Sequence, residues 1–363
     1  MATTEKIFKA LSTVQDPDLK KDLATLNMIR NVKVEGNKVS FQVVLTTPAC
    51  PLKEVIKNNC IEAIHKLVSP DLEIAIETIS EVTSTRLNTA MLPDVKNIIA
   101  VASGKGGVGK STVAANLAIS LSLSGARVGL IDADIYGPSA PTMFNCENQQ
   151  PEIIEKDGRN LIVPVEQYGV KLISIGFLTP QDNAIVWRGP MASSALRQFI
   201  TDADWGELDY LLIDLPPGTS DIHLTMVQTL PVTGAIIVTT PQKVALIDAS
   251  KGAAMFKQPQ INVPVLGIVE NMAYFTPEEL PNNKYYIFGK DGGKKLAEKL
   301  GIPLIGQIPL VQGIRESGDS GYPAALKDDP TAEAFRRLAE NVAQQVAIRN
   351  ATLEKTKVVE YKV

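Results

Sequence analysis

A glycine-rich run at residues 104–111, GKGGVGKS, is the segment of this 363-residue chain whose residue types could act on phosphate groups. It fits the spacing G-x-x-x-x-G-K-[ST], in which the glycines let consecutive backbone N–H groups turn inward around a phosphate. Lys110 is expected to neutralise the β- and γ-phosphates of ATP, and the Ser111 hydroxyl is expected to ligate Mg²⁺. The spacing therefore predicts a Mg-ATP site that needs no cluster of histidine ligands.

Two elements must position this loop, a strand before it and a helix after it. The apolar run 98–102 precedes the loop and a helical run, 112–123, follows it, so the motif stands in the context that it requires. The helix would point its positive end at the same phosphate charge. The residues predicted here to contact the nucleotide are Gly104, Lys105, Gly106, Gly107, Val108, Gly109, Lys110, Ser111 and Thr112.

A Mg²⁺ ion beside the γ-phosphate needs a carboxylate ligand, and two further strand ends provide aspartates. Asp214 follows the apolar run 210–213 and is the predicted Mg²⁺ ligand; the alternative is that it caps the next turn. Gly218 is expected to sense the γ-phosphate through its backbone. Asp132 and Asp134 end another such run, where carboxylates face the ligand crevice of an open sheet. Asp134 is predicted to position the attacking water, whereas Asp132 fits a structural role about as well.

The order of the remaining elements predicts an α/β fold for residues 96–349. Apolar runs bounded by Gly or Pro alternate with helical stretches, which is typical of a mostly parallel sheet with helices on both faces. A last helix, 331–348, places four apolar residues on one face, which indicates core packing. The runs expected to form strands are 98–102, 128–131, 172–175, 210–213, 235–238, 265–269 and 304–308.

Residues 1–80 predict a separate, small α+β domain. Strands at 29–35 and 38–46 flank Gly36-Asn37, which suits a tight hairpin; a helix at 51–67 and a strand near 72–76 follow. Residues 81–95 are expected to be a linker because they are rich in Ser, Thr and Asn and lack a period, and 350–363 a flexible tail.

The overall composition limits the partners. Lys and Arg number 36 against 40 Asp and Glu, a net charge of −4, which gives no electrostatic reason to expect nucleic acid. No apolar run is long enough for a membrane span and the first residues lack a signal-peptide core, so we expect a cytoplasmic protein without a membrane partner. Three cysteines, an odd number without any CxxC, fit a reducing compartment.

The second lysine of the loop, Lys105, makes 104–111 resemble the deviant Walker A group of P-loop NTPases, which includes MinD, ParA, the arsenite-pump ATPase and the nitrogenase iron protein. In that group the extra lysine reaches across a homodimer to the nucleotide of the partner. The resemblance implies a homodimer in which Lys105 joins Lys110 and Asp134 as the catalytic residues.

Four further segments, 132–139, 187–191, 214–221 and 267–272, resemble the Mrp/ApbC family of iron–sulfur cluster carrier ATPases. This resemblance implies that the chain binds a cluster, such as a 4Fe-4S cluster, and transfers it to apo iron–sulfur proteins, in contact with cluster-assembly proteins. It also implies that Asn271 hydrogen-bonds the adenine.

The amino-terminal segments 16–19 and 46–52 resemble the small SufT-like domain often fused to such carriers. Cys50 precedes the predicted helix, whose positive end would favour a thiolate, and it is the candidate cluster ligand; the alternative is a packed small hydrophobe. Cys60 and Cys146 are expected to be structural or incidental.

One departure from the family pattern keeps other functions open. Carriers of this family place a CxxC shortly after the segment that matches 271–275, and no cysteine follows Cys146 here. A regulatory or scaffold ATPase of cluster assembly, which holds no cluster itself, is therefore an alternative. A MinD/ParA-like positioning switch is another, although the basic anchor or nucleic-acid face that it needs is not seen, and a redox role is the least favoured.

Overall fold

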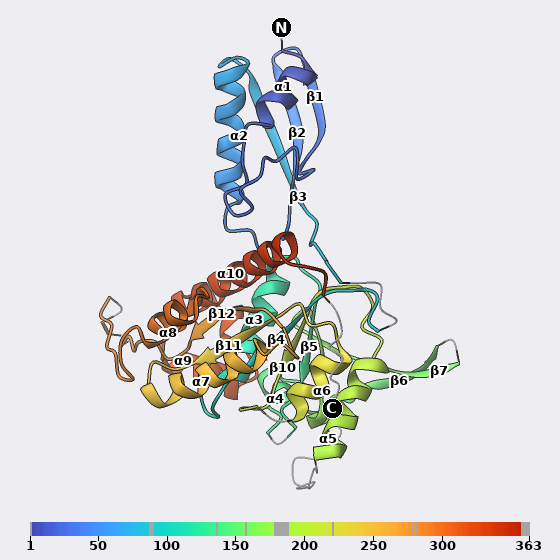
Figure 1. The fold of residues 1–363 in the computed structure, drawn as a ribbon, viewed down its shortest axis with the longest axis vertical. Helices are drawn as coiled ribbons and strands as arrows, with labels where there is room; N and C mark the ends of the chain where they lie inside the picture. Colours follow the sequence, from blue (N-terminus) through green and yellow to red (C-terminus); the bar gives the residue numbers. More distant parts are fainter. Residues whose placement is uncertain are drawn as a thin grey trace. The chain divides into compact units, whose positions relative to one another are not determined.

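The structure is a computed structural model that describes residues 2–86, 91–135, 137–156, 158–177, 189–219, 221–277, 279–280 and 282–356 (Figure 1). Contacts divide the chain into two units. The first contains Met1–Thr83 with Ala347–Leu353, and the second contains Ser84–Val346 with Glu354–Val363. Of the segments singled out in the sequence, residues 87–90, 136, 187–188, 220 and 357–363 lie outside the described part.

The first unit has the predicted α+β pattern. Its sheet has the order β1-β2-β3, with β1 antiparallel and β3 parallel to β2. One face of the sheet and the two helices enclose a core that includes Ile7, Phe41 and Ile64. The elements are α1 Thr4–Leu11, β1 Ile29–Glu35, β2 Lys38–Leu45, α2 Lys53–Leu67 and β3 Glu73–Ser80.

The second unit is built on an eight-stranded sheet with the order β13-β12-β11-β4-β10-β5-β9-β8. All neighbours are parallel except β8, which runs antiparallel to β9. The seven apolar runs predicted as strands are all strands of this sheet. The strands are β4 Val95–Ala102, β5 Val128–Asp132, β8 Val165–Gln167, β9 Val170–Ser174, β10 Leu208–Asp214, β11 Gly234–Thr239, β12 Val265–Glu270 and β13 Leu304–Gln307.

Helices cover both faces of this sheet, as predicted. Alternate residues of β4 are buried on opposite faces of the sheet. Ile98 and Ala100 belong to the cluster that packs under α5, α6, α7 and α8. Ile99 and Val101 are equally buried on the other face, where α3 lies. The last helix, α10, buries Phe335 and the other apolar residues of its predicted stripe. The helices are α3 Lys110–Leu123, α4 Ala140–Met143, α5 Gly189–Thr201, α6 Asp221–Thr229, α7 Lys243–Phe256, α8 Gly292–Leu300, α9 Gln312–Asp319 and α10 Pro330–Thr352, with 3₁₀ turns at Ile175–Phe177 and Ala324–Leu326.

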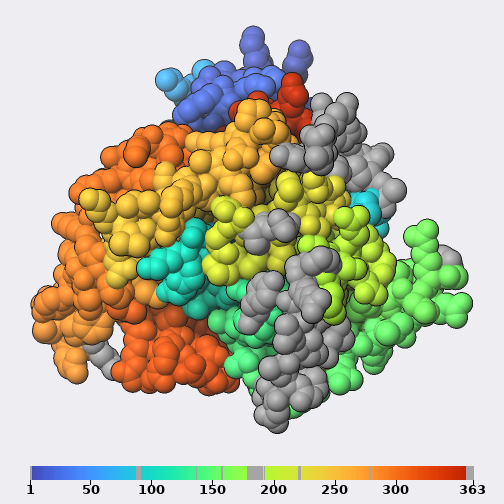
Figure 2. Space-filling model, turned by 60° about the horizontal axis from the view of Figure 1, so that its bottom comes forward, coloured from blue at the N-terminus to red at the C-terminus, as the bar shows by residue number. Residues whose placement is uncertain are grey.

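Two segments extend from opposite ends of the second unit (Figures 1 and 2). At the β8 end, a hairpin of β6 Glu152–Lys156 and β7 Arg159–Val163 projects outward, and it was not predicted from the sequence. At the β13 end, the segment that joins β12 to α8 forms a long excursion. The phosphate loop lies between these ends, because β4, β10 and β5 are neighbours in the middle of the sheet.

Three expected boundaries shift. Helix α2 begins at Lys53 rather than at residue 51, and α10 continues to Thr352, past the expected start of the tail. The end of the expected linker is held by Arg86, whose guanidinium donates to the carbonyl groups of Met91, Leu92 and Val95. Among the described residues, no helix is both long enough and apolar enough to span a membrane.

Candidate functional site: a phosphate loop closed by two aspartates

The phosphate loop connects β4 to α3 and is held from two sides. Gly104 packs against α7 so closely that a Cβ atom there would lie 2.1 Å from the backbone carbonyl of Asp248. Gly109 has a φ of +79°, and a Cβ atom on it would lie 2.2 Å from the side-chain nitrogen of Asn271. A side chain at either position would displace the loop, so the two glycines fix the course of its backbone.

The side chain of Lys110 connects the loop to two of the predicted aspartates. Its Nζ lies 2.6 Å from Oδ1 of Asp214 and 3.6 Å from Oδ2 of Asp134, and it donates to Oγ of Ser111 at 3.3 Å. Lys110 and Asp214 are both buried. Burial raises the pKa of Asp214, while the ammonium of Lys110 opposes that rise. The sequence prediction that these residues share one site is consistent with this geometry.

This donor set fits Mg²⁺. The Ser111 hydroxyl and the Asp214 carboxylate both lie within 3.3 Å of the same ammonium group, so hard oxygen ligands converge at one point. Mg²⁺ is usually bound by one or two such protein oxygens together with phosphate oxygens and water. Ser111 and Asp214 would therefore hold the ion beside the phosphates that the loop binds.

The contacts of Asp132 are those of a side chain that supports the surrounding backbone. Asp132 is fully buried, and its carboxylate accepts hydrogen bonds from the backbone N–H groups of Asp134, Ser139 and Ala140 and from the hydroxyl of Ser174. Burial, reinforced by the nearby Asp214 carboxylate, raises the pKa of Asp132 to about 7. The contacts fix the turn that presents Asp134, whose side chain retains partial exposure next to Lys110.

The remaining predicted residues surround this centre. Lys105 is exposed and forms no ion pair with the described residues, while its carbonyl oxygen accepts from the hydroxyl of Ser103. The backbone N–H of Gly218 donates to the carbonyl of Ser103 at 2.9 Å, so this amide contacts the start of the loop. Thr112 lies in the first turn of α3, at the phosphate end of the helix.

Asn271 and its neighbour Glu270 connect the phosphate loop to the β13 end of the sheet. The Asn271 side-chain amide donates to the carbonyl of Val108 at 2.8 Å; the predicted adenine contact stays a prediction. Glu270 is fully buried, and its carboxylate accepts from the backbone N–H of Gly293 and from Nε2 of Gln307, both at 2.6 Å. Sequence reasoning missed Glu270, although a glutamate at the end of an otherwise apolar strand was a signal for it.

Two of the three cysteines, Cys50 and Cys60, belong to the first unit, and Cys146 belongs to the second. Cys50 is half-buried beside the core of the first unit, three positions before the first residue of α2, so the helix end lies farther from its thiol than predicted. Cys60 and Cys146 are buried, as expected for structural cysteines, and burial raises the pKa of each thiol to about 12. Within the described residues, no three His, Cys, Asp or Glu side chains form a group that could hold a metal ion.

Comparison with known proteins shows the family. Residues 94–343 match the family described as NUBPL iron-transfer P-loop NTPase, and residues 4–74 match the family described as iron-sulfur cluster assembly protein. The chain belongs to the NUBPL iron-transfer P-loop NTPase family. The second unit is accordingly a nucleotide-binding P-loop NTPase of the α/β class, and the first is the small assembly-associated domain that the sequence suggested.

Relatives match over nearly the whole chain. The "Iron-sulfur cluster carrier protein" of Synechocystis sp. is 47% identical over 356 residues, which cover 96% of this chain and 99% of that protein. The protein of the same name from Deinococcus radiodurans is 46% identical and covers 95% of this chain and 96% of its own. A solved nucleotide-binding protein from Archaeoglobus fulgidus, in complex with ADP, is 39% identical, with a TM-score of 0.57, and the match covers 66% of this chain and 92% of that one.

The fit of Gly104 against α7 predicts a specific sensitivity. Gly104→Ala should weaken ATP binding about tenfold or more, because the added methyl group collides with backbone atoms and must push the loop aside. Gly313→Ala in α9 is the control, since no atom would lie within 4 Å of its Cβ and it is not part of the phosphate loop. Titration of both variants with a fluorescent ATP analogue measures the difference; equal affinities would contradict the proposed fit.

The pair formed by Glu270 and Gln307 predicts a rescue. Glu270→Gln replaces the charged acceptor of the Gly293 N–H and of Nε2 of Gln307 by a neutral amide, and the weaker hydrogen bonds should lower the melting temperature by roughly 2–12 °C. The reversed pair, Glu270→Gln with Gln307→Glu, restores donor and acceptor and should recover most of the loss. Thermal melts of the single and double variants test this, and a double variant no more stable than the single ones would show that the two side chains do not interact.

The thiols should react at different rates. At pH 8 the raised pKa values keep Cys60 and Cys146 protonated as well as buried, so iodoacetamide should modify Cys50 first in the folded chain. Mass spectrometry of peptides after timed alkylation measures the order. Addition of denaturant should equalise the three rates, and early modification of Cys60 in the folded chain would be inconsistent with the described packing.

Proposed function

We propose that this chain is an ATP-hydrolysing iron–sulfur cluster carrier, which binds a cluster and passes it to apo iron–sulfur proteins. The observation that carries the ATPase part is the contact of Lys110 with Asp214, Asp134 and Ser111, which gathers a cation, two carboxylates and a hydroxyl at the end of a phosphate loop. The carrier part is supported by relatives of that name, which match along nearly the whole chain.

In the hydrolytic step, each residue of this cluster has a role that its position supports. The backbone N–H groups of 104–111 hold the phosphates, and Lys110 stabilises the negative charge of the transferring phosphoryl group. Asp134, partly exposed beside Lys110, orients the attacking water. Ser111 and Asp214 would hold Mg²⁺, which would neutralise charge on the phosphate oxygens. Asn271 contacts the adenine, and Gly218 senses the γ-phosphate through its backbone.

The working form would be a homodimer. Lys105 is exposed at the rim of the loop and pairs with no described carboxylate, so it is available to reach the nucleotide of a second copy. ATP would then favour the closed dimer and ADP would let the subunits separate, which couples slow hydrolysis to a change of population.

The cargo needs thiolates, and the chain has three cysteines to offer. Cys50 is the best candidate because it is half-buried, whereas the thiol pKa values of Cys60 and Cys146 are raised by burial. One thiolate from each subunit of a dimer would give two ligands for a 4Fe-4S cluster, with the remainder from the recipient or an assembly protein. The specific alternative is an assembly ATPase whose partner holds the cluster, which the missing CxxC favours.

Anaerobic reconstitution with iron and sulfide separates the two possibilities. For a carrier, the wild type should gain iron and visible absorption; Cys50→Ala should lose both, while the Cys60→Ala control should retain them. ATP hydrolysis should persist in both variants because both cysteines belong to the first unit, whereas the phosphate loop belongs to the second. A wild type that hydrolyses ATP but takes up no iron would refute the self-sufficient carrier in favour of the assembly ATPase.

A further inference from the structure

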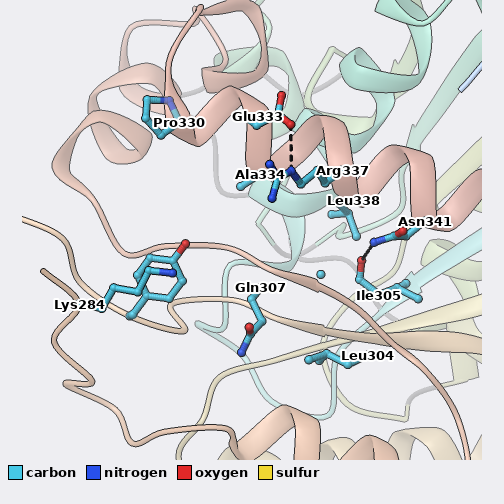
Figure 3. A pocket seen from close by; sticks show the side chains of 12 residues that line it. Lys284, Leu304, Ile305, Gln307, Pro330, Glu333, Ala334, Arg337, Leu338 and Asn341 are labelled. Atoms are coloured by element: carbon cyan, nitrogen blue, oxygen red, sulfur yellow. Dashed lines mark hydrogen bonds and ion pairs between the residues drawn. The ribbon is translucent and has the colours of Figure 1, made fainter. Parts of the chain in front are cut away.

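The second unit contains a pocket, and none of the residues that line it belongs to the nucleotide site (Figure 3). It opens between strand β13, the first turns of α10 and the segment that joins β12 to α8. Its volume is about 460 Å³, within the roughly 300–1,000 Å³ range of ligand-binding pockets. We call it the β13 pocket; the side chains that define it are Tyr274, Lys284, Gln307, Arg337, Leu338 and Asn341.

Two cations, Lys284 and Arg337, and one carboxylate, Glu333, line the β13 pocket, so its positive charges outnumber its negative one. Lys284 and Arg337 line different walls (Figure 3). Nζ of Lys284 lies 4.0 Å from the centroid of the Tyr274 ring and forms no ion pair with a described residue. Nε of Arg337 donates to one carboxylate oxygen of Glu333 at 2.9 Å, but the other oxygen accepts from Arg336 at 2.6 Å. One carboxylate therefore serves two guanidinium groups, which leaves cationic capacity at the pocket for an acidic ligand.

The floor of the pocket is an edge of the sheet. β13 ends the strand order of the described sheet, and the carbonyl oxygen of Ile305, on its outer side, accepts from Nδ2 of Asn341 at 2.9 Å. The backbone of this edge therefore faces α10 and the hollow between them. Leu304 and Leu338 add apolar surface beside it. Where a sheet edge is not covered, an extended peptide can add to it as a further strand, with pockets for alternate side chains.

The pocket also borders the contacts that lead to the nucleotide. Gln307 lines it and donates to the buried carboxylate of Glu270, next to Asn271, which holds the carbonyl of Val108 in the phosphate loop. An occupant that moves Gln307 would thus act on a group one residue away from a loop contact.

We propose that the β13 pocket binds an acidic, extended peptide segment of a protein partner. The peptide lies along β13, one carboxylate side chain enters between Lys284 and Arg337, and a neighbouring apolar side chain packs on Leu304 and Leu338. Arg337 offers planar, paired donors that suit a carboxylate, while Lys284 supplies a second charge from the opposite direction. The cluster-binding proposal is not needed for this inference, since no cysteine takes part in it.

The chain provides a matched control for the test. Lys290 lies over the Tyr286 ring at 4.9 Å, as Lys284 lies over Tyr274, and Arg315 pairs with Asp319 one helical turn away, as Arg337 pairs with Glu333, but neither Lys290 nor Arg315 lines the pocket. The test pair is Lys284→Ala with Arg337→Ala, and the control pair is Lys290→Ala with Arg315→Ala. Both remove the same charge and the same kinds of contact. Equal melting temperatures and ATP affinities of the two double variants verify that the fold is intact.

The probe is a random octapeptide library displayed on phage, selected on the full-length chain, with the enriched peptides then synthesised and titrated. The expected result is a set of acidic peptides whose affinity falls about tenfold or more in the test pair and changes within about twofold in the control pair. The proposal would be overturned if the enriched peptides lacked acidic residues, or if both double variants lost affinity equally. It would also be overturned if selection on the wild-type chain enriched no peptides relative to selection on the test double variant. Glutarate alone binding as tightly as the peptides would overturn it too, in favour of a small-molecule carboxylate site.

Discussion

The ammonium group of Lys110 lies where the carboxyl ends of β4, β10 and β5 meet, and much of the second unit is arranged around it. Its charge is set against Asp214 and Asp134 at a point where water is largely excluded, so either carboxylate would be costly there without it. The parallel register makes the arrangement possible, because Asp214 is the cross-strand partner of Asp132 on one side and of Val101, near the start of the loop, on the other. Topology and electrostatics therefore specify the same site.

A supporting layer keeps the groups that face Lys110 in place. Asp132 collects backbone N–H groups and holds the turn of Asp134, while α7 and Asn271 confine Gly104 and Gly109. None of these supports needs to touch a phosphate. They reduce the number of conformations that the loop can adopt, which is the usual way in which a protein prepares a site before its ligand arrives.

Much of this could be predicted from the sequence because the signals are local. Each of the seven predicted strands is a largely apolar run, and the loop motif stands between one such run and a helix. The hairpin β6–β7 and the short β8 were missed, since their residues are largely exposed or partly buried and show no strong pattern. The start of α2 was placed too early because Pro51 suits a first helical turn but does not require one.

The pair of Glu270 and Gln307 shows the limit more clearly. The two residues are 37 positions apart, each is ordinary in its own segment, and only the packing of β13 against β12 makes them partners. Likewise, the role of Asp132 could not be separated from that of Asp134 by spacing, because it depends on which backbone N–H groups fold back over the strand end. Long-range pairings of this kind carry no periodic signal along the chain.

The tie between Glu270 and Gly293 has a consequence for how the chain could change over time. The carboxylate that ends β12 also holds the first turn of α8, so the two ends of the intervening segment are pinned together at the sheet. Substitutions inside such a segment can change its sequence while its two ends, and the phosphate loop beyond them, keep their positions. Side chains inside the segment, such as Tyr274 and Lys284, could therefore be exchanged without loss of the anchor points at its two ends.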